Sequence, residues 1–128
     1  MKILGIGVDI IDNKRLYKSI KNKNFLSRIF TTHEIKNSRY TKDKSAYFSK
    51  KFAAKESFSK ALGTGFRLGL NFKDIEILND KNGKPFFSKS RKIDTIINKK
   101  FNVKKYDLFL SISDEKDYSI AFTTLQTK

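Results

Sequence analysis

The sequence has 128 residues, which is enough for one domain with a modest core but little for a self-sufficient enzyme cleft. It contains no run of 18 apolar residues and no cysteine, which excludes a transmembrane helix, disulfides and thiolate metal sites. The first residues lack the apolar core and cleavage site of a signal peptide, so we expect a cytoplasmic protein without a membrane partner. The formal charge of +15 favours anionic partners, although 23 of the 28 basic residues are lysine, so clusters are more informative than the total.

Residues 2–8 predict a buried strand, because apolar and β-branched residues surround two glycines. Gly5 and Gly7 fall on one face of this strand, where another backbone or a ligand can approach closely. Asp9 follows the apolar run, and a carboxylate there is costly unless it is hydrogen-bonded or binds a cation. Asp9 could instead cap the next helix, but Asp12 is better placed for that role.

Residues 13–39 predict short helices, the first over 13–23, with a capping box between Thr31 and Glu34. His33 is the only histidine, and no catalytic triad can be built around it. Residues 14–28 are strongly basic and contain no acidic residue. The basic residues are Lys14, Arg15, Lys18, Lys21, Lys23 and Arg28, and they alternate with Leu16, Ile20, Phe25, Leu26 and Ile29. Basic charge with exposed apolar anchors suits an acidic helix of a partner, whereas a solvated lysine face is the alternative.

Residues 45–62 predict one long helix, ended by Gly63, because no proline or glycine interrupts them. One face carries the apolar stripe Tyr47, Ala54, Phe58, Ala61 and Leu62. Glu56 and Lys60 fall on nearly the opposite face, beside Ser49 and Phe52, and this predicts a second contact surface. Taken alone, a glutamate four residues before a lysine is also an ordinary surface pair worth about 0.3–0.5 kcal/mol.

The residue pattern of the second half of the chain predicts a loop, followed by strands and one helix. The glycines of residues 63–69 end the long helix and expose backbone N–H groups that can meet phosphate. A short turn at 71–73 is followed by a hairpin over 74–88, with strands 74–78 and 85–88 and the turn Asn82-Gly83. A helix over 90–100 precedes strands 106–113 and 118–125. We therefore predict a single α+β domain over 1–128, with an antiparallel sheet packed against one long helix.

Asp9 and Glu56 are the carboxylates that the first strand and the long helix could bring together. A hard dication such as Mg²⁺ binds through one or two carboxylates, waters and substrate phosphate. Phosphoryl transfer needs the charge on the phosphate neutralised and the nucleophile held in line. Lys60, one turn from Glu56, could add a positive charge on the leaving side.

Two motifs together resemble holo-acyl-carrier-protein synthases, the small type of 4′-phosphopantetheinyl transferase. They are Gly5-Ile6-Gly7-Val8-Asp9-Ile10 and the ten residues from Phe52 to Ala61, Phe-Ala-Ala-Lys-Glu-Ser-Phe-Ser-Lys-Ala. Asn82-Gly83-Lys84-Pro85 and Ser111-Ile112-Ser113 extend the resemblance over essentially the whole chain. It implies transfer of the 4′-phosphopantetheinyl group from coenzyme A to a serine of apo-acyl carrier protein, with Mg²⁺. Adenosine 3′,5′-bisphosphate is the implied by-product, and fatty acid biosynthesis the implied pathway.

The resemblance also implies roles for individual residues. Asp9 and Glu56 would hold the metal, and Lys60 would contact the phosphate and protonate the leaving group. Either Glu56 or a metal-bound water would remove the serine proton. The nucleotide side would be lined by Lys51, Gly65, Gly83, Lys84 and Pro85, and the carrier protein would be met by Arg15, Phe25 and Arg28. Relatives are typically homotrimers with the active site between subunits, which agrees with the short chain and with the helix face at Phe52.

The chain departs from the family pattern at two positions. Lys51 stands where many relatives have an arginine, which keeps the charge but loses the bidentate fork. Asp114 stands where many relatives have a histidine, which puts a contact to the adenosine part in doubt.

Two other functions are compatible with the composition. A nucleic-acid-binding module would need aromatic residues exposed on strands beside basic groups, and we expect no nucleic-acid partner. A non-catalytic binder of acidic proteins would use residues 14–28.

Overall fold

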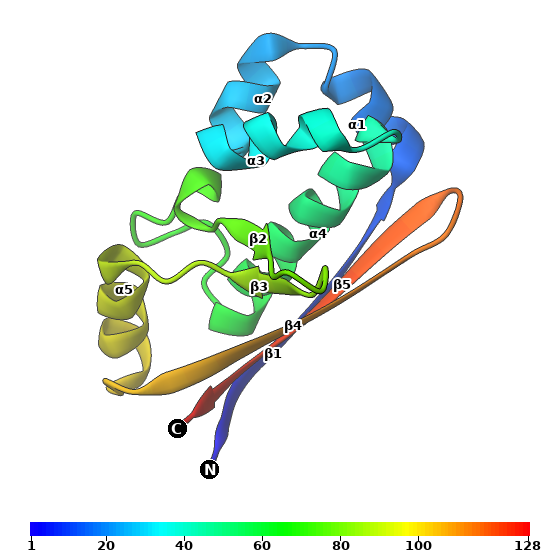
Figure 1. Cartoon of the computed structure of the whole chain (residues 1–128). Helices are drawn as coiled ribbons and strands as arrows, with labels where there is room; N and C mark the ends of the chain where they lie inside the picture. The colour runs from blue at the N-terminus through cyan, green and yellow to red at the C-terminus, as the bar shows by residue number, and fades with distance from the viewer.

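A three-stranded antiparallel sheet and one long helix packed across its face form the centre of the computed structural model, which describes residues 1–128 (Figure 1). The strands are β1 (Ile3–Asp12), β4 (Tyr106–Asp114) and β5 (Tyr118–Thr127), in the order β1-β5-β4. The first and last strands of the chain are therefore neighbours, and both termini lie at one end of the sheet. The predicted α+β class, with an antiparallel sheet on a long helix, is confirmed.

Most helices begin and end close to where the sequence predicts, but the helix predicted over 13–23 ends at Ser19, and Asn22 caps a separate helix. The helices are α1 (Asn13–Ser19), α2 (Lys23–Ile29), α3 (Thr32–Asn37), α4 (Lys44–Leu62) and α5 (Arg91–Phe101), with 3₁₀ turns η1 (Ser38–Tyr40) and η2 (Phe72–Asp74). Asp12 caps α1 through the backbone N–H of Lys14 at 2.9 Å, the capping box of α3 is present, and Gly63 ends α4 with φ 77°. In Figure 1, α1, α2 and α3 surround the N-terminal end of α4. None of the helices is long and apolar enough to cross a membrane.

The hairpin is shorter than predicted. It consists of β2 (Ile77–Asn79) and β3 (Pro85–Phe87), which pair antiparallel. Asp74 belongs to the preceding 3₁₀ turn instead, because its carboxylate accepts a hydrogen bond from the backbone N–H of Asn71 at 2.8 Å and closes that turn.

The prediction that the first strand is buried is wrong. β1 runs four residues further, to Asp12, and forms an edge of the sheet. Its residues alternate: Gly7 is buried against α4, whereas Ile6, Val8 and Ile10 are 53%, 51% and 59% exposed on the other face. An apolar run alone does not separate a fully buried strand from an edge strand with apolar residues on both faces.

Helix α4 is buried on almost every side, more than its apolar stripe predicts. The buried polar residues on it are Ser49, Lys51, Lys55, Ser57 and Ser59, in addition to the predicted stripe. Phe52 stacks on Phe25 of α2 at 6.4 Å and on Phe72 at 5.5 Å, both ring-centroid distances. The predicted second contact surface is therefore present at Phe52, and its partners there are α2 and η2 of the same chain.

Candidate active site

The backbone of β1 lies directly against the backbone of α4. A Cβ atom added at Gly7 would lie 1.8 Å from the carbonyl oxygen of Ser57, and one added at Gly5 would lie 1.8 Å from that of Ala61. Only glycine allows this contact, so the predicted close approach is confirmed, with a backbone as the approaching group. Asp9 is two residues beyond Gly7 on the same face, which brings its carboxylate beside α4.

This contact brings three of the predicted site residues together. The Lys60 ammonium donates to Oδ1 of Asp9 and to the carbonyl oxygen of Val8, each at 3.1 Å. The Asp9 side chain is 16% exposed, and that of Lys60 is 52% exposed. Burial raises the pKa of Glu56, and the neighbouring negative charge of Asp9 raises it further, while Lys60 and Arg15 act in the opposite direction.

Asp9 and Glu56 form a donor set that fits a hard dication. The chain has no cluster of three or more His, Cys, Asp and Glu residues, so no metal cage is built from protein ligands alone. The negative charge of Asp9 disfavours the charged form of Glu56, which a bound cation would relieve, and Mg²⁺ needs only one or two carboxylates because it keeps several waters and uses substrate phosphate as a ligand. The arrangement can therefore hold a pyrophosphate group between a cation and the Lys60 ammonium.

A second group of predicted residues lines a cavity of about 180 Å³. Its lining is Tyr47, Lys50, Lys51, Ile77, Asn79, Gly83, Pro85, Ile112 and Asp114. Lys51, Gly83 and Pro85 are thus brought together, as predicted for the nucleotide side. Lys84 is exposed in the hairpin turn and Gly65 lies beyond the end of α4, and neither lines this cavity.

Lys51, which was predicted to line the nucleotide side, is buried. It donates to the carbonyl oxygen of Ile77 at 3.0 Å and to Oδ1 of Asn79 at 3.5 Å. Burial lowers its pKa to about 8, and Lys55 and Lys50 lower it further, against the opposing charges of Glu34 and Glu76. Its charge at neutral pH therefore depends on the local environment, which a bound anion would change.

Helix α4 separates the two groups of residues. Lys51 and Lys60 are nine residues apart, which places them on opposite sides of a helix with about 3.6 residues per turn. Asp9 lies on the edge strand β1, whereas Ile112 and Asp114 lie on the opposite edge strand β4. A single chain therefore presents the carboxylate pair and the 180 Å³ cavity on opposite sides.

The residues predicted to meet a carrier protein lie on α1 and α2. Arg15 and Arg28 are exposed, and Arg15 is close enough to Glu56 to lower its pKa. Phe25 is half-buried against Phe30 and Phe52. The predicted exposed apolar anchors are wrong in part, because Leu16 and Ile29 belong to the core.

The sequence did not reveal a fully buried ion pair next to the site. The Lys55 ammonium lies 2.8 Å from Oε1 of Glu34, with both side chains 0% exposed, and it also donates to the carbonyl oxygen of Phe72 at 3.0 Å. Oε2 of Glu34 accepts the backbone N–H of Ile77 at 2.8 Å. This pair joins α4 to α3 and to the segment before β2. Lys55 adjoins Glu56 in the motif, but its spacing alone gives no sign of burial.

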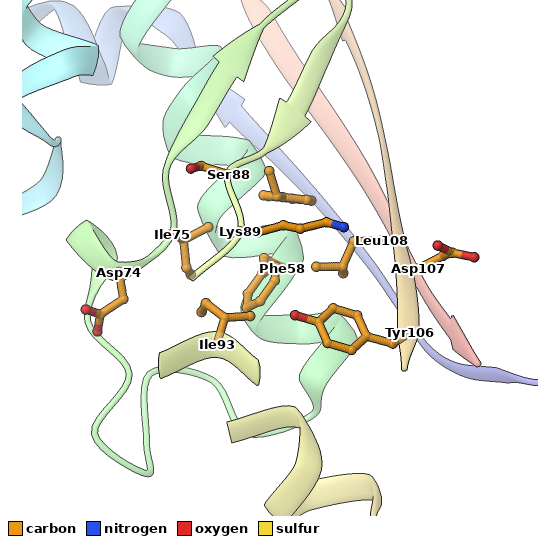
Figure 2. Close-up of a pocket in the computed structure, with 10 residues that line it drawn as sticks. Phe58, Asp74, Ile75, Ser88, Lys89, Ile93, Tyr106, Asp107 and Leu108 are labelled. Atoms are coloured by element: carbon orange, nitrogen blue, oxygen red, sulfur yellow. The ribbon is translucent and has the colours of Figure 1, made fainter. Parts of the chain in front are cut away.

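A third hollow, of about 100 Å³, lies between α4, α5 and β4. Figure 2 shows Phe58, Ile93 and Leu108 around it, with the Lys89 side chain extended across it. None of the predicted site residues lines this hollow, so it is separate from both groups described above.

Comparison with known proteins places the chain among similar sequences and folds. A family model described as the 4′-phosphopantetheinyl transferase superfamily matches residues 5–123. A holo-[acyl-carrier-protein] synthase of Pelagibacter ubique (strain HTCC1062) is 56% identical over 128 residues, covering 100% of both chains. The crystal structure of holo-[acyl-carrier-protein] synthase from Neisseria meningitidis has a TM-score of 0.87 and 35% identity, covering 98% of this chain and 99% of that one. The synthase from Bacillus anthracis str. Ames, in complex with CoA (3′,5′-ADP), has a TM-score of 0.83 and 33% identity, covering 100% of both.

Proposed function

The chain belongs to the 4′-phosphopantetheinyl transferase superfamily and is a phosphopantetheinyl transferase, and we propose that it moves this group from coenzyme A to a serine of apo-acyl carrier protein. The observation that carries the proposal is the contact of Gly7 with Ser57, which sets Asp9 beside Glu56 and Lys60. The product, a holo-carrier protein, would serve fatty acid biosynthesis in the cytoplasm.

Asp9 and Glu56 would hold Mg²⁺, which supplies charge neutralisation at the pyrophosphate of coenzyme A when bound. The serine oxygen of the carrier forms a bond to the phosphorus that bears pantetheine, and the bond from that phosphorus to the bridging oxygen breaks. The bonding electrons go to that oxygen, which leaves with adenosine 3′,5′-bisphosphate. Lys60 donates a proton or a hydrogen bond to it, because its ammonium is exposed and lies 3.1 Å from Asp9.

Glu56 is the better of the two carboxylates to accept the serine proton. Burial and the charge of Asp9 raise the pKa of Glu56. Glu56 is therefore a stronger base than an unperturbed carboxylate, with a pKa closer to the operating pH. Asp9 is already hydrogen-bonded to Lys60 and is less available.

The two separated groups of residues would meet between copies of the chain. The open face of the sheet exposes large apolar side chains on all three strands: Ile6, Val8, Ile10, Phe109, Ile120 and Phe122. Monomeric proteins rarely leave such a continuous apolar face in water. Head-to-tail packing of copies would place the β1 edge of one chain beside the β4 edge of the next, and three copies would close the ring. Each active site would then combine Asp9, Glu56 and Lys60 of one chain with the 180 Å³ cavity of its neighbour.

The exposed basic residues of α1 and α2 would dock the carrier protein. Arg15 lies near Glu56, so a carrier bound at Arg15 and Arg28 would bring its serine close to the carboxylate pair. Phe25 contributes a half-buried aromatic edge to the same surface. An acidic recognition helix fits this charge, and the contacts would weaken as salt rises. Gly65 and Lys84 would complete the nucleotide side.

The nucleic-acid alternative lacks the surface that it needs. Phe109, Tyr118 and Phe122 are exposed on strands, but β1, β4 and β5 contain neither lysine nor arginine. The exposed aromatic side chains of the sheet therefore have no basic residues beside them on the strands to neutralise the phosphates of a nucleic acid whose bases they would stack on. A non-catalytic binder of acidic proteins would leave Asp9, Glu56 and the close approach of β1 to α4 without a use.

The test is to incubate the protein with coenzyme A, Mg²⁺ and an apo-acyl carrier protein and to weigh the carrier by mass spectrometry. We expect a mass gain of one phosphopantetheinyl group, and no gain without Mg²⁺. No gain with the wild-type chain, or an equal gain with Glu56→Ala, would refute the proposal. Tight, salt-sensitive binding of nucleic acid without transfer would support the alternative instead.

A further inference from the structure

The 180 Å³ cavity combines charges of both signs, which a site for a phosphate alone would not do. Lys50 and Lys51 contribute ammonium groups to its lining, and Asp114 contributes a carboxylate. Asp114 forms no ion pair and its side chain accepts no hydrogen bond within the chain, whereas five other aspartates pair with lysine or cap a helix. Its carboxylate therefore stays available to a ligand in this cavity.

A carboxylate repels a phosphate and attracts a hydrogen-bond donor. The part of the ligand near Asp114 should therefore carry an N–H or O–H group, while the part near Lys50 and Lys51 carries negative charge. The nucleotide end of coenzyme A has both: a 3′-phosphate on the ribose, and donors on the 2′-hydroxyl and on the 6-amino group of adenine.

The lining around Asp114 favours the adenine base over the ribose. Ile112 and Asp114 are two residues apart on β4, so their side chains stand on the same face of the strand, next to each other. Ile77 and Pro85 add apolar surface to the same cavity. An apolar wall with a hydrogen-bond acceptor at its edge matches a flat ring with an exocyclic amine. The charged groups of Lys50 and Lys51 come from α4, on the other side of the cavity.

We propose that Asp114 is a specificity-determining residue, whose carboxylate accepts a hydrogen bond from the 6-amino group of the adenine of coenzyme A. The inference rests on the proposed transfer from coenzyme A. A base with a carbonyl oxygen at the 6-position would place an acceptor against this carboxylate, so the hydrogen bond would be lost and two oxygens with negative charge would face each other.

The test compares kcat/KM for coenzyme A with kcat/KM for its hypoxanthine analogue, in which the 6-amino group is replaced by a carbonyl oxygen. We expect the wild-type enzyme to prefer coenzyme A by at least about tenfold. Asp114→Ala should bring the ratio close to one, mainly by lowering kcat/KM for coenzyme A. Asp114→Asn should shift the ratio toward the analogue, because its amide can donate to the carbonyl oxygen.

A matched control and a second analogue make the result specific. Glu115→Ala removes a neighbouring carboxylate that does not line the cavity, and it should leave the ratio at the wild-type value. A preference that survives in Asp114→Ala would overturn the inference while leaving the transferase proposal intact. The inference would also be overturned if Asp114→Ala removed the loss of kcat/KM caused by a 2′-deoxyribose analogue and left unchanged the loss caused by the hypoxanthine analogue. That result would place the contact at the ribose. Absence of transfer by the wild-type enzyme with coenzyme A itself would overturn both.

Discussion

Burial shifts two ionisable side chains of α4 in opposite directions. Glu56 has a raised pKa, so its charged form is disfavoured, and Lys51 has a pKa lowered to about 8, so its charged form is disfavoured as well. Both shifts have desolvation as their largest cause. A bound ion of opposite charge would therefore stabilise the charged form of each side chain, as expected for groups that bind ligands.

Glu56→Gln should separate activity from stability. A carboxyl whose folded-state pKa is raised stabilises the fold below its unfolded pKa and loses that contribution as the pH rises through the folded value. At pH 7 the ionised group costs stability, so the neutral amide should leave Tm unchanged or higher. Transfer should fall by at least about 100-fold, because the proposed metal ligand and proton acceptor is lost. Differential scanning calorimetry and the mass assay measure the two effects, with Glu115→Gln as the exposed control. A fall in Tm that parallels the loss of rate would instead indicate a structural role.

The charge of Lys51 should make nucleotide binding depend on pH. Burial lowers the pKa of Lys51 to about 8, with smaller contributions from Glu34, Lys55, Lys50 and Glu76, so Lys51 is mostly charged at pH 7 and mostly neutral at pH 9. We expect the affinity for adenosine 3′,5′-bisphosphate, measured by calorimetry, to fall up to about tenfold between these two values. Lys51→Arg stays charged and should lose much less. An equal loss in both proteins would show that another group is responsible.

At this scale the sequence predicted which side chains lie together better than it predicted their surroundings. The two glycines predicted the close approach at β1, and the motif spacing predicted Asp9, Glu56 and Lys60 as a group. Burial of Lys51 and Lys55 could not be predicted, because both fall beside the apolar stripe and lysine is rarely buried. Their partners, the carbonyl groups of Ile77 and Phe72, become neighbours only when the chain folds.

At the scale of elements, the contact between β1 and α4 positions the site, and the Lys55–Glu34 pair fixes α4. The capping residues predicted the helix ends well, since Asp12, Thr31 and Gly63 act through local hydrogen bonds or a local dihedral angle. The exposure of β1 was mispredicted, because edge and central strands differ in their neighbours and these are set by the order β1-β5-β4.

Gly7→Ala should damage the fold and the site together. The added methyl group would lie 1.8 Å from the carbonyl oxygen of Ser57, so β1 and α4 must separate. We expect a loss of at least about 2 kcal/mol in the free energy of unfolding by urea denaturation. Displacing Asp9 from Glu56 by about 1 Å should reduce transfer by about 100-fold. Gly69→Ala is the control: no atom lies within 4 Å, and only its φ of 79° should cost about 1 kcal/mol. Equal losses for the two variants would contradict the close-contact account.

At the scale of the whole molecule, one face of the sheet is covered by α4 and the other is apolar and exposed. The residue pattern of β4 alone could not show that the open face would be apolar across three strands. The residues Val8 and Phe122 are paired neighbours on the open face, from opposite ends of the chain. Such a surface forms only after the first and last strands meet, so the number of copies is not encoded in any local pattern.

Val8→Lys should prevent assembly without unfolding the chain. The side chain is 51% exposed on the open face, so a lysine there meets water in the monomer and an apolar interface in the oligomer. Sedimentation velocity should give a trimer for the wild-type chain and a monomer for the variant, with a native-like circular dichroism spectrum for both. Transfer should be lost with assembly. Lys116→Ala, on the β4–β5 turn, should remain assembled. A monomeric wild-type chain with full activity would contradict the composite site.

The most direct test of the account is to mix two impaired variants, each damaged in a different half of the site, and to assay them at a coenzyme A concentration well below KM. Glu56→Gln removes the carboxylate half, and Lys51→Gln removes the cavity half on the other side of α4. If each site takes one half from each of two neighbouring chains, random assembly after dissociation and mixing should restore about one quarter of the wild-type transfer rate per chain. Activity of the mixture equal to the sum of the two separate variants would contradict a site shared between neighbours.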